Sequence, residues 1–525
     1  MKKWSGYRHE ICQESFDTII IGSGMSGLTA AVLLSQYGQR VLVLEKHFKA
    51  GGFTHTFTRK KYEWDVGIHY IGEVHNTKSH TRKLFDRITD GNLQWAKMDD
   101  NYDRIIFPDQ SYDFVAPKEK LIDILIGHFP EEKKAINDYI SLLESYVKSG
   151  RGYFASKALP KWLTPFLYRS MTKPFFEYAD RMTKDVLREF TQNEKLLGVL
   201  TGQWGDHGSP PGRSSFAMHA MVARHYLDGG NYPVGGSRMI AEYATDEIEK
   251  HGGKVVVNAG VDEILTKGKK AVGVRLENGD ELFASKVISS AGLMNTVNTF
   301  LRHQSSGEMF KEKMKTVRPT ESYLCLYMGL NKTAKELGFK NTNLWIYPGY
   351  DHDQNVEKFR TNPNGEFPVV YVSFPSAKDP EWDKNHPGCA TMEAITLGPW
   401  DQFKAWKDEP WQGRGESYEA LKDSLSKKIL DVVYKHVPQA EGAMDYYELS
   451  TPLSVRNMAN YPIGEMYGLD HTPERFHQKW LRPQTEIKNL YLTGQDVTTV
   501  GLTSALFSGL LTASSVLGKN LIKTL

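Results

Sequence analysis

The sequence has little cysteine, and the few cysteines lie far apart. Three thiols, at Cys12, Cys325 and Cys389, occur in 525 residues. Their number is odd and they lack the clustered spacing of a disulfide framework or a zinc site. This excludes both kinds of crosslink as the basis of the fold. We therefore expect a reducing, cytoplasmic environment.

The chain also lacks an excess of charge of either sign. Its 65 basic and 63 acidic side chains give a formal net charge of +2. That balance excludes a nucleic-acid-binding surface spread over the whole molecule, so no nucleic-acid partner is expected. The first residues, MKKWSGYRHEICQESFD, contain no apolar stretch of the kind found in secretory signals. We expect no export.

Long apolar runs are scarce, and one needs an explanation. Residues 497–518, VTTVGLTSALFSGLLTASSVLG, carry no charge and are long enough to cross a bilayer core of roughly 30 Å. Their many glycine, serine and threonine residues suit close packing inside a protein. We predict a buried helix here. The total length exceeds the usual size of a single core, which predicts two or more packed domains.

The N-terminal stretch contains the pattern of a dinucleotide-binding unit. It reads as a strand, a glycine turn, a helix and a second strand, at residues 17–21, 22–27, 28–37 and 40–45. In the G-x-G-x-x-G turn, Gly22 permits the tight bend, Gly24 lets the backbone approach a pyrophosphate, and Gly27 lets the helix pack on the strand. Glu45 ends the second strand, where an acid accepts hydrogen bonds from a ribose hydroxyl. Nearby candidates for the same site are Ser23, Ser26 and Lys46.

Two later stretches return to an α/β pattern. Residues 232–253 predict a helix with a glycine stop, residues 254–265 a strand, and residues 271–292 a meander with a hairpin turn at Asn278-Gly279. Residues 490–518 predict a strand, a loop and the apolar helix. In the long segments between them, alternating strands such as 322–330 and 367–375 indicate an antiparallel sheet.

The predicted fold class is therefore α/β, with a Rossmann-like parallel sheet that binds a dinucleotide. The segment EKHFKAGGFTHTF, which follows the second strand, resembles flavoproteins of the glutathione-reductase-like superfamily, and this resemblance implies that the dinucleotide is FAD. An inserted α+β substrate domain contains the antiparallel sheet. The domains are discontinuous: the cofactor domain comprises residues 11–76, 225–300 and 480–525, and the substrate domain comprises residues 77–224 and 301–479.

Several motifs resemble a known family. They are GGFTHTF, DVGIHYIG, FAMHAMVARHY, GGNYPVGGS, SSAGLMNT and NLYLTGQDVTTVGLTSAL, which begin at residues 51, 65, 216, 229, 289 and 489. On these motifs the chain resembles the retinol saturase and carotenoid isomerase branch of the phytoene-desaturase-like flavoproteins. The resemblance implies FAD as the cofactor. It also implies further cofactor-contacting residues, namely Gly51, Gly52, Thr54, Val261, Ala291, Gly292, Gly494, Asp496 and Thr503.

The resemblance also implies a substrate and a reaction. Members of this branch act on long conjugated polyenes, so we expect reduction of a carbon–carbon double bond in a lipophilic polyene, with carotenoid cis–trans isomerisation or desaturation as the alternatives. No second G-x-G-x-x-G follows a strand, so a separate nicotinamide domain is absent. Transiently bound NAD(P)H, a quinone or a carrier protein could then exchange electrons with the flavin.

Candidate catalytic residues follow from the DVGIHYIG motif, which should run past the flavin. His69 and Tyr70 are candidate proton donors, although a histidine or tyrosine in a buried strand is more often a satisfied core residue. Pocket-lining candidates are His55, Trp204 and Tyr232. We predict no metal site, because the histidines around His69 lack ligand spacing on one helix face.

Two further expectations concern partners. Residues 148–184 interleave basic and aromatic side chains, as in a peripheral membrane contact, with an ordinary amphipathic helix pair as the alternative. A flavin-free isoprenoid-binding escort, like the GDP dissociation inhibitors of Rab GTPases, is the rival outside enzymes. Glu45, the Gly51-Gly52 pair and the GQD segment argue against that rival. The sequence predicts no oligomeric state.

Overall fold

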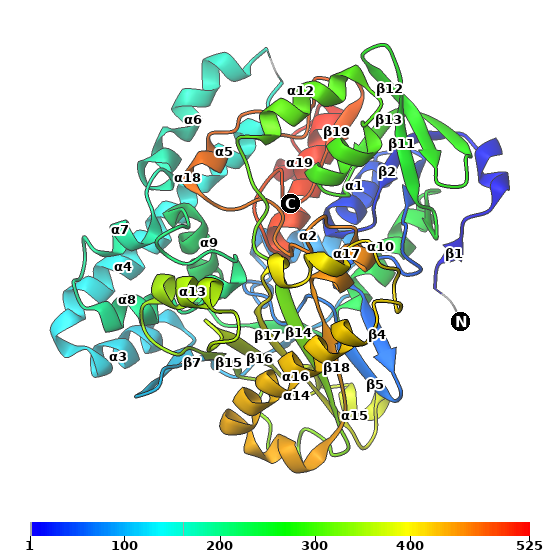
Figure 1. The fold of residues 1–525 in the computed structure, drawn as a ribbon. Coiled ribbons are helices and arrows are strands. Elements are labelled where there is room, and N and C mark those ends of the chain that lie inside the picture. The colour runs from blue at the N-terminus through cyan, green and yellow to red at the C-terminus, as the bar shows by residue number, and fades with distance from the viewer. Residues whose placement is uncertain (1–2, 161) are drawn as a thin grey trace.

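The computed structural model describes residues 3–160 and 162–525, which fold around two sheets (Figure 1). The larger sheet has eight strands in the order β1-β10-β3-β2-β13-β12-β11, with β19 paired to β13. These strands are β1 Ser5–Gly6, β2 Phe16–Ile21, β3 Val41–Leu44, β10 Lys254–Val257, β11 Val261–Lys267, β12 Lys270–Leu276, β13 Glu281–Ser289 and β19 Leu490–Leu492. Its centre is parallel, while β11, β12 and β13 form an antiparallel meander. This arrangement confirms the predicted Rossmann-like class.

One predicted strand is two strands in the structure. The pattern of residues 254–265 predicts a continuous strand, but β10 ends at Val257 and β11 begins at Val261. Asn258 between them has φ 53°, a left-handed conformation that asparagine tolerates better than most residues. The chain therefore turns here, and the second half joins the meander instead of extending β10.

Three helices cover the larger sheet, and two of them cross closely. Helix α1 (Met25–Gln36) packs between α10 (Arg238–Lys250) and α19 (Leu502–Leu517). A Cβ on Gly509 would lie 2.5 Å from the Ser26 carbonyl oxygen, so the crossing requires glycine. The long uncharged segment at residues 497–518 thus contains a buried helix, as expected. No helix in the described part of the chain is long and apolar enough to cross a membrane.

The second sheet has seven strands in the order β18-β14-β17-β16-β15-β7-β8. They are β7 Asn101–Ile106, β8 Ser111–Val115, β14 Tyr323–Leu330, β15 Asn343–Ile346, β16 Val370–Ser373, β17 Ala390–Leu397 and β18 Met444–Ser450. Neighbours are antiparallel except for β7 and β15, as the alternating patterns predicted. Against this sheet packs a hairpin, β4 (Thr56–Arg59) and β5 (Tyr62–Asp65). In the same core cluster lie Trp64 and Tyr327, both buried.

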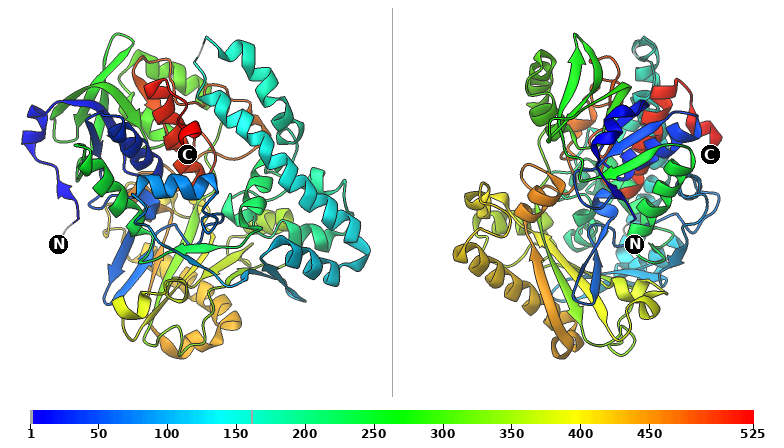
Figure 2. Two further views of the ribbon diagram at one scale, coloured as in Figure 1. Left: turned by 180° about the vertical axis from the view of Figure 1, so that it is seen from behind. Right: turned by 90° about the vertical axis from the view of Figure 1, so that its right-hand side faces the viewer.

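A group of helices flanks the second sheet, as the two further views show (Figure 2). Its members are α3 Lys118–His128, α4 Lys133–Tyr146, α5 Gly150–Lys157, α6 Thr164–Ala179, α7 Thr183–Leu187, α8 Glu194–Leu200 and α9 Phe216–Tyr226. The remaining helices are α2 His80–Ile88, α11 Leu293–Asn295, α12 Ser305–Met314, α13 His352–Thr361, α14 Pro375–Lys378, α15 Trp382–Asn385, α16 Glu416–His436, α17 Pro452–Ala459 and α18 Pro473–Phe476. A short pair, β6 Trp95–Lys97 with β9 Asn231–Pro233, completes the strands.

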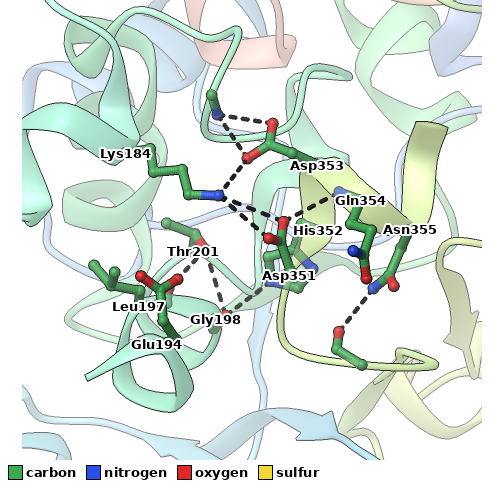
Figure 3. A network of polar contacts seen from close by, with 12 residues as sticks. Lys184, Glu194, Leu197, Gly198, Thr201, Asp351, His352, Asp353, Gln354 and Asn355 are labelled. Atoms are coloured by element: carbon green, nitrogen blue, oxygen red, sulfur yellow. Dashed lines mark hydrogen bonds and ion pairs between the residues drawn. The ribbon is translucent and has the colours of Figure 1, made fainter. Parts of the chain in front are cut away.

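Polar contacts fasten the helical group to the second sheet (Figure 3). The Lys184 ammonium lies 3.4 Å from carboxylate oxygens of both Asp351 and Asp353, and the Gly212 amide also donates to Asp353 at 2.9 Å. The His352 ring contacts the Gly198 carbonyl at 2.8 Å. These contacts hold the start of α13, which follows β15, against α8 and the loop before α9.

Two helices pack across the expected domain boundaries. Helix α2 contributes Leu84 and Phe85 to the cluster that contains α1 and α19. Helix α12 contributes Phe310 to the cluster on the other face of the larger sheet. Both helices belong to segments that the sequence assigns to the substrate domain. The exact boundaries stay a prediction, since the cores of the two parts are continuous with these helices.

Candidate functional site

A cavity of about 500 Å³ lies between the two sheets, within the roughly 300–1,000 Å³ typical of ligand pockets. One wall comes from the larger sheet and its loops, and the other from the second sheet with the β4–β5 hairpin. Most of the predicted cofactor residues line it, namely Gly22, Ser23, Gly24, Ser26, Glu45, Lys46, Gly51, Gly52, Thr54, Val261, Ala291, Gly292, Gly494 and Asp496. Segments distant in sequence therefore meet in one site.

The glycine turn has the geometry that its sequence predicted. Gly22 has φ 92°, which a residue with a side chain rarely adopts. A Cβ on Gly27 would lie 2.3 Å from the Gly22 carbonyl oxygen, so only glycine lets α1 start this close to β2. A Cβ on Gly24 would meet nothing nearer than the Ser290 hydroxyl at 3.9 Å. Gly24 therefore leaves its backbone open toward the cavity, although Gly27 itself does not line it.

Glu45 is held at the end of β3 by backbone and hydroxyl donors. Its Oε2 accepts hydrogen bonds from the Ser23 amide at 3.0 Å and the Ser23 hydroxyl at 2.5 Å, and its Oε1 accepts from the His47 amide at 2.8 Å. The Ser23 hydroxyl also accepts from the Gly51 amide at 3.0 Å. These bonds join the glycine turn, the acid and the Gly51-Gly52 segment into one rigid cradle.

Asp496 fixes the distant half of the site. Its carboxylate accepts hydrogen bonds from the Leu293 amide at 2.7 Å and the Leu469 amide at 3.0 Å. The buried Arg475 guanidinium donates to the carbonyls of Leu469, Gln495 and Thr498. The loop that leads into α19 is thus held from behind. Because Asp496 already has two backbone partners, a role in orienting this loop accompanies any cofactor contact.

The start of α19 lies at the cavity. Gly501 has φ 98°, a Cβ added to it would meet no atom within 4 Å, and Leu502 and Ala505 line the cavity. The Thr503 hydroxyl is buried without a hydrogen-bond partner among the described residues, and Thr503 does not line the cavity. Helix N-termini stabilise negative charge. An anionic group of a bound cofactor would therefore be stabilised at this end.

These observations fit a bound flavin dinucleotide. The glycine cradle leaves space where a pyrophosphate approaches a helix N-terminus. A second helix N-terminus opens into the same cavity, where it can stabilise charge on a reduced flavin.

The opposite wall is apolar and aromatic. It comprises chiefly Phe53, Phe57, Val66, Ile68, Tyr327, Val455, Met458, Tyr461, Met466 and Tyr467. The charged side chains that line this wall, Arg59 and Glu448, form an ion pair at 3.0 Å. His55 lies at the junction of the walls, and burial lowers the pKa of its ring to about 4. A neutral His55 adds no charge there. Such a surface suits a long hydrocarbon better than a charged substrate.

The structure places His69 and Tyr70 behind this wall. The chain lines the cavity through Ile68 and then leaves it, so neither residue is part of the lining. The Tyr70 hydroxyl donates to Asp103 at 2.9 Å, and Nδ1 of His69 lies 2.8 Å from Oε2 of Glu393. Burial lowers the pKa of His69 to about 3, which leaves its ring neutral. Neither residue is therefore placed to contact a substrate bound in the cavity.

Trp204 and Tyr232 also lie outside the cavity lining. Trp204 is buried in the core of the second sheet and the helical group. The Tyr232 hydroxyl donates to Asp65, which also accepts from the amide and hydroxyl of Ser237 at 2.9 and 2.5 Å. Tyr232 therefore helps to fix the end of the β4–β5 hairpin. The pocket-lining interpretation of both residues is corrected, because packing and hydrogen bonding hold them elsewhere.

The sequence reasoning missed Tyr327, Tyr461 and Tyr467. Tyr327 lies in β14, a strand that the alternating pattern predicted, but the pattern does not say which face meets the cavity. The other two tyrosines lie in a loop without a periodic signal. Among the described residues, one group has ligand atoms close enough for a metal ion: His9, Cys12 and Asp280, on the surface. It is separate from the histidines considered above and from the cavity.

Comparison with known proteins fits this geometry. Residues 25–296 match the family described as flavin containing amine oxidoreductase. The chain belongs to this family. FAD is accordingly its cofactor, and the resemblance to flavoproteins drawn from the motifs is confirmed. A flavin-containing family favours the enzyme over the flavin-free escort.

Relatives narrow the comparison further. The chain is 36% identical over 531 residues to an all-trans-retinol 13,14-reductase of Danio rerio, covering 97% of this chain and 87% of that protein. It is 26% identical over 472 residues to a prolycopene isomerase of an Oncidium hybrid cultivar, covering 84% and 73%. A solved putrescine oxidase bound to putrescine has a TM-score of 0.62 at 15% identity, covering 96% of this chain and all of that one. At that identity the third likeness shows the fold alone.

Proposed function

We propose that this flavoprotein reduces a carbon–carbon double bond in a lipophilic polyene such as a retinoid. The observation that supports this proposal most strongly is the cavity, in which a nucleotide cradle faces an aromatic and aliphatic wall. The substantial identity to an all-trans-retinol 13,14-reductase supports this choice. Cis–trans isomerisation is the second candidate, supported by the similarity to a prolycopene isomerase.

Different residues of the chain would bind the cofactor and position the substrate. Bound FAD, once reduced, would supply a hydride to the substrate. The cradle of Gly22, Gly24 and Glu45 would hold the dinucleotide, and the Gly51-Gly52 segment and the α19 N-terminus would contact the ring system. Phe57, Tyr327 and Tyr461 would keep the polyene flat against the ring and exclude water. A second hydrogen must arrive as a proton, and a polar group at the apolar wall must deliver it.

Product mass separates the two reactions. The holoenzyme is reduced with dithionite, incubated anaerobically with all-trans-retinol, and its product is analysed by mass spectrometry. A gain of two hydrogens is the expected result. Unchanged mass with altered retention on chromatography would make the protein an isomerase, and unchanged retinol would contradict both. A second reduction cycle started with NADH or NADPH tests nicotinamides as the electron donor.

We also propose that the α5–α6 hairpin contacts a lipid surface. Trp162 and Phe166 are 72% and 77% exposed, and Arg169 and Lys173 of α6 are exposed beside them. In Figure 1 the hairpin projects at the upper edge of the molecule. Exposed aromatic side chains beside basic ones are typical of interfacial binding. Docking of the hairpin on a lipid surface would let a hydrophobic substrate enter the protein without crossing water.

Vesicle binding tests the hairpin directly. The double variant W162S/F166S should bind vesicles of phosphatidylcholine with phosphatidylserine at least about tenfold more weakly than the parent, because two apolar anchors are lost. Phe283 is 59% exposed on β13, so Phe283→Ser is a matched control that should leave binding unchanged. Equal binding of the double variant and the parent in a cosedimentation assay would contradict the proposal.

A further inference from the structure

A set of acidic side chains lies buried behind the apolar wall. Asp65, Asp103 and Glu393 are 2%, 0% and 0% exposed, and one lysine, Lys378, is buried among them. The Lys378 ammonium donates to the His69 carbonyl at 2.9 Å, to the Ser373 hydroxyl at 2.7 Å and to the Asn343 side chain. Three donors thus meet three acceptors, which suits a charged lysine. Burial lowers the pKa of Lys378 to about 7, against the opposing effect of Glu393, Asp103 and Asp65, and a carboxylate that forms nearby favours the charged ammonium. One buried cation cannot balance three buried carboxylates.

Hydrogen-bond donors distinguish the three acids. Asp65 accepts three hydrogen bonds, from Tyr232 and from two groups of Ser237. Asp103 also accepts three, from Tyr70, Gln203 and Asn343 at 2.9, 2.7 and 2.8 Å. Such donors favour the ionised form of a carboxyl group. Both aspartates can therefore give up their protons.

Glu393 lacks this support. Its carboxyl is close to the Asp65 amide, and its Oε2 lies 2.8 Å from Nδ1 of His69, yet neither oxygen accepts a well-formed hydrogen bond within the described structure. A protonated Glu393 carboxyl can donate a hydrogen bond to Nδ1 of the neutral His69 ring, which gives both of these atoms a partner. Burial accordingly raises the pKa of Glu393 to about 8, against the opposing effect of Lys378. Glu393 is thus the acid that keeps its proton.

Glu393 also connects with the cavity. In the sheet it lies directly opposite Tyr327 of β14, and directly opposed side chains share one face with Cβ atoms about 4.5–5.5 Å apart. Tyr327 lines the cavity, and Cys325, two residues away on the same face, is near enough to raise the pKa of the Tyr327 hydroxyl, which burial raises most. On its other side, Glu393 contacts His69, whose side chain is 13% exposed.

We propose that Glu393 stores the proton that the reduction consumes and passes it to the cavity through the Tyr327 hydroxyl. This inference rests on the proposed reductase function. One carbon of the double bond accepts the hydride with its electron pair. The neighbouring carbon takes the Tyr327 proton, so the π bond becomes two C–H bonds. Glu393 reprotonates the tyrosine oxygen, its carboxylate is balanced by Lys378, and the His69 side returns a proton from solvent.

Two variants and two controls test this path. Glu393→Gln keeps the size of the side chain but carries no acidic proton, and Tyr327→Phe removes only the hydroxyl. The controls are Glu247→Gln, a buried glutamate of α10 paired with Lys250, and Tyr139→Phe, a buried tyrosine bonded to His219 at 2.8 Å. FAD content, measured from the flavin absorbance of each purified holoenzyme, confirms folding.

The first readout needs no substrate. Infrared difference spectra of the holoenzyme, recorded while the pH is raised from 6 to 10, should show protonated carboxyl bands. Burial also raises the pKa of Glu465, to about 7, and that of Asp206, so these two acids contribute to the bands of every variant. The band component that disappears near pH 8 should be missing in Glu393→Gln and present in Glu247→Gln. Its presence in Glu393→Gln would overturn the proposal. The groups that face Glu393 and shape this titration are His69, Asp65, Lys378, Cys325 and Tyr327.

The second readout is reduction of all-trans-retinol by the dithionite-reduced enzyme. Both site variants should lose roughly 10²-fold in rate, the usual contribution of a general acid, while both controls keep the parent rate. Parent turnover should fall as the pH rises through 8, because the stored proton is then lost. Full activity in Glu393→Gln overturns the proton path alone. A parent enzyme that reduces no polyene overturns the reductase proposal together with this path.

Discussion

The two walls of the cavity differ in what they present to a ligand. The nucleotide wall offers backbone, and Gly22, Gly24 and Gly27 shape it by having no side chain. The wall from the second sheet offers side chains, with Tyr327 at the surface and Glu393 buried behind it. The first wall therefore depends on space and the second on protonation. Substitutions should separate these two dependencies.

The largest effect is expected on the nucleotide wall from Gly27→Val. The new Cβ would lie 2.3 Å from the Gly22 carbonyl, so α1 must move away from β2. We expect a loss of about 3–5 kcal/mol in unfolding free energy and purification without flavin. Gly127→Ala in α3 meets no atom within 4 Å and should not destabilise. Thermal unfolding and flavin absorbance measure both variants, and normal flavin content in Gly27→Val would refute the close-contact argument.

The next effect is expected behind the second wall, in the pH dependence of stability. Burial raises the pKa of Glu393 from its ordinary 4.5 to about 8. The folded chain therefore holds a proton that the unfolded chain has released, and this stabilisation is lost as the pH rises from 4.5 to 8. Glu393→Gln should remove that loss. The unfolding free energy of the variant, measured relative to that of the parent, should therefore be roughly 2–4 kcal/mol higher at pH 8 than at pH 5. Urea unfolding at both values measures it; parallel stabilities would contradict the stored proton.

A smaller effect should show that Tyr232 belongs to the framework. Tyr232→Phe removes one of three donors to Asp65, which should cost about 1.5–3 kcal/mol because the acceptor is charged. Flavin content and the Michaelis constant for retinol should stay at the parent values. Tyr139→Phe breaks a bond between neutral groups and should cost less, about 0.5–1.5 kcal/mol. A raised Michaelis constant for retinol in Tyr232→Phe would show instead that Tyr232 contacts the substrate.

The smallest effect concerns Thr503. Its hydroxyl has no partner in the described structure, so Thr503→Val should change stability by less than about 0.5 kcal/mol. If the hydroxyl binds the cofactor, FAD affinity should fall by about 0.5–1.5 kcal/mol. Thr512→Val removes a bond to the Leu492 carbonyl and should affect stability but not affinity. Unchanged FAD affinity in Thr503→Val, measured by titration of the apoprotein, would remove Thr503 from the cofactor residues.

The same contrast explains which parts of the site could be predicted. The glycine turn, α1, β3 and Glu45 occupy 24 consecutive residues, from Gly22 to Glu45, and each has a residue-type signature with a physical reason. Glu393 and Tyr327 are far apart in sequence and meet because β14 pairs with β17, which local periodicity cannot show. The DVGIHYIG motif reaches the cavity at Ile68, but the chain then turns inward, so His69 and Tyr70 do not line the cavity.

The packing of α19 against α1 also bears on how the protein is made. Residues near position 25 contact residues near position 509, so the cofactor cradle is completed by a helix that is synthesised long after the glycine turn. Contacts between segments this far apart form slowly, and until they form the apolar face of α1 stays exposed. A nascent chain should therefore need a chaperone or a delay before it can load FAD. Flavin incorporation would follow the synthesis of α19 and would not be an early folding step.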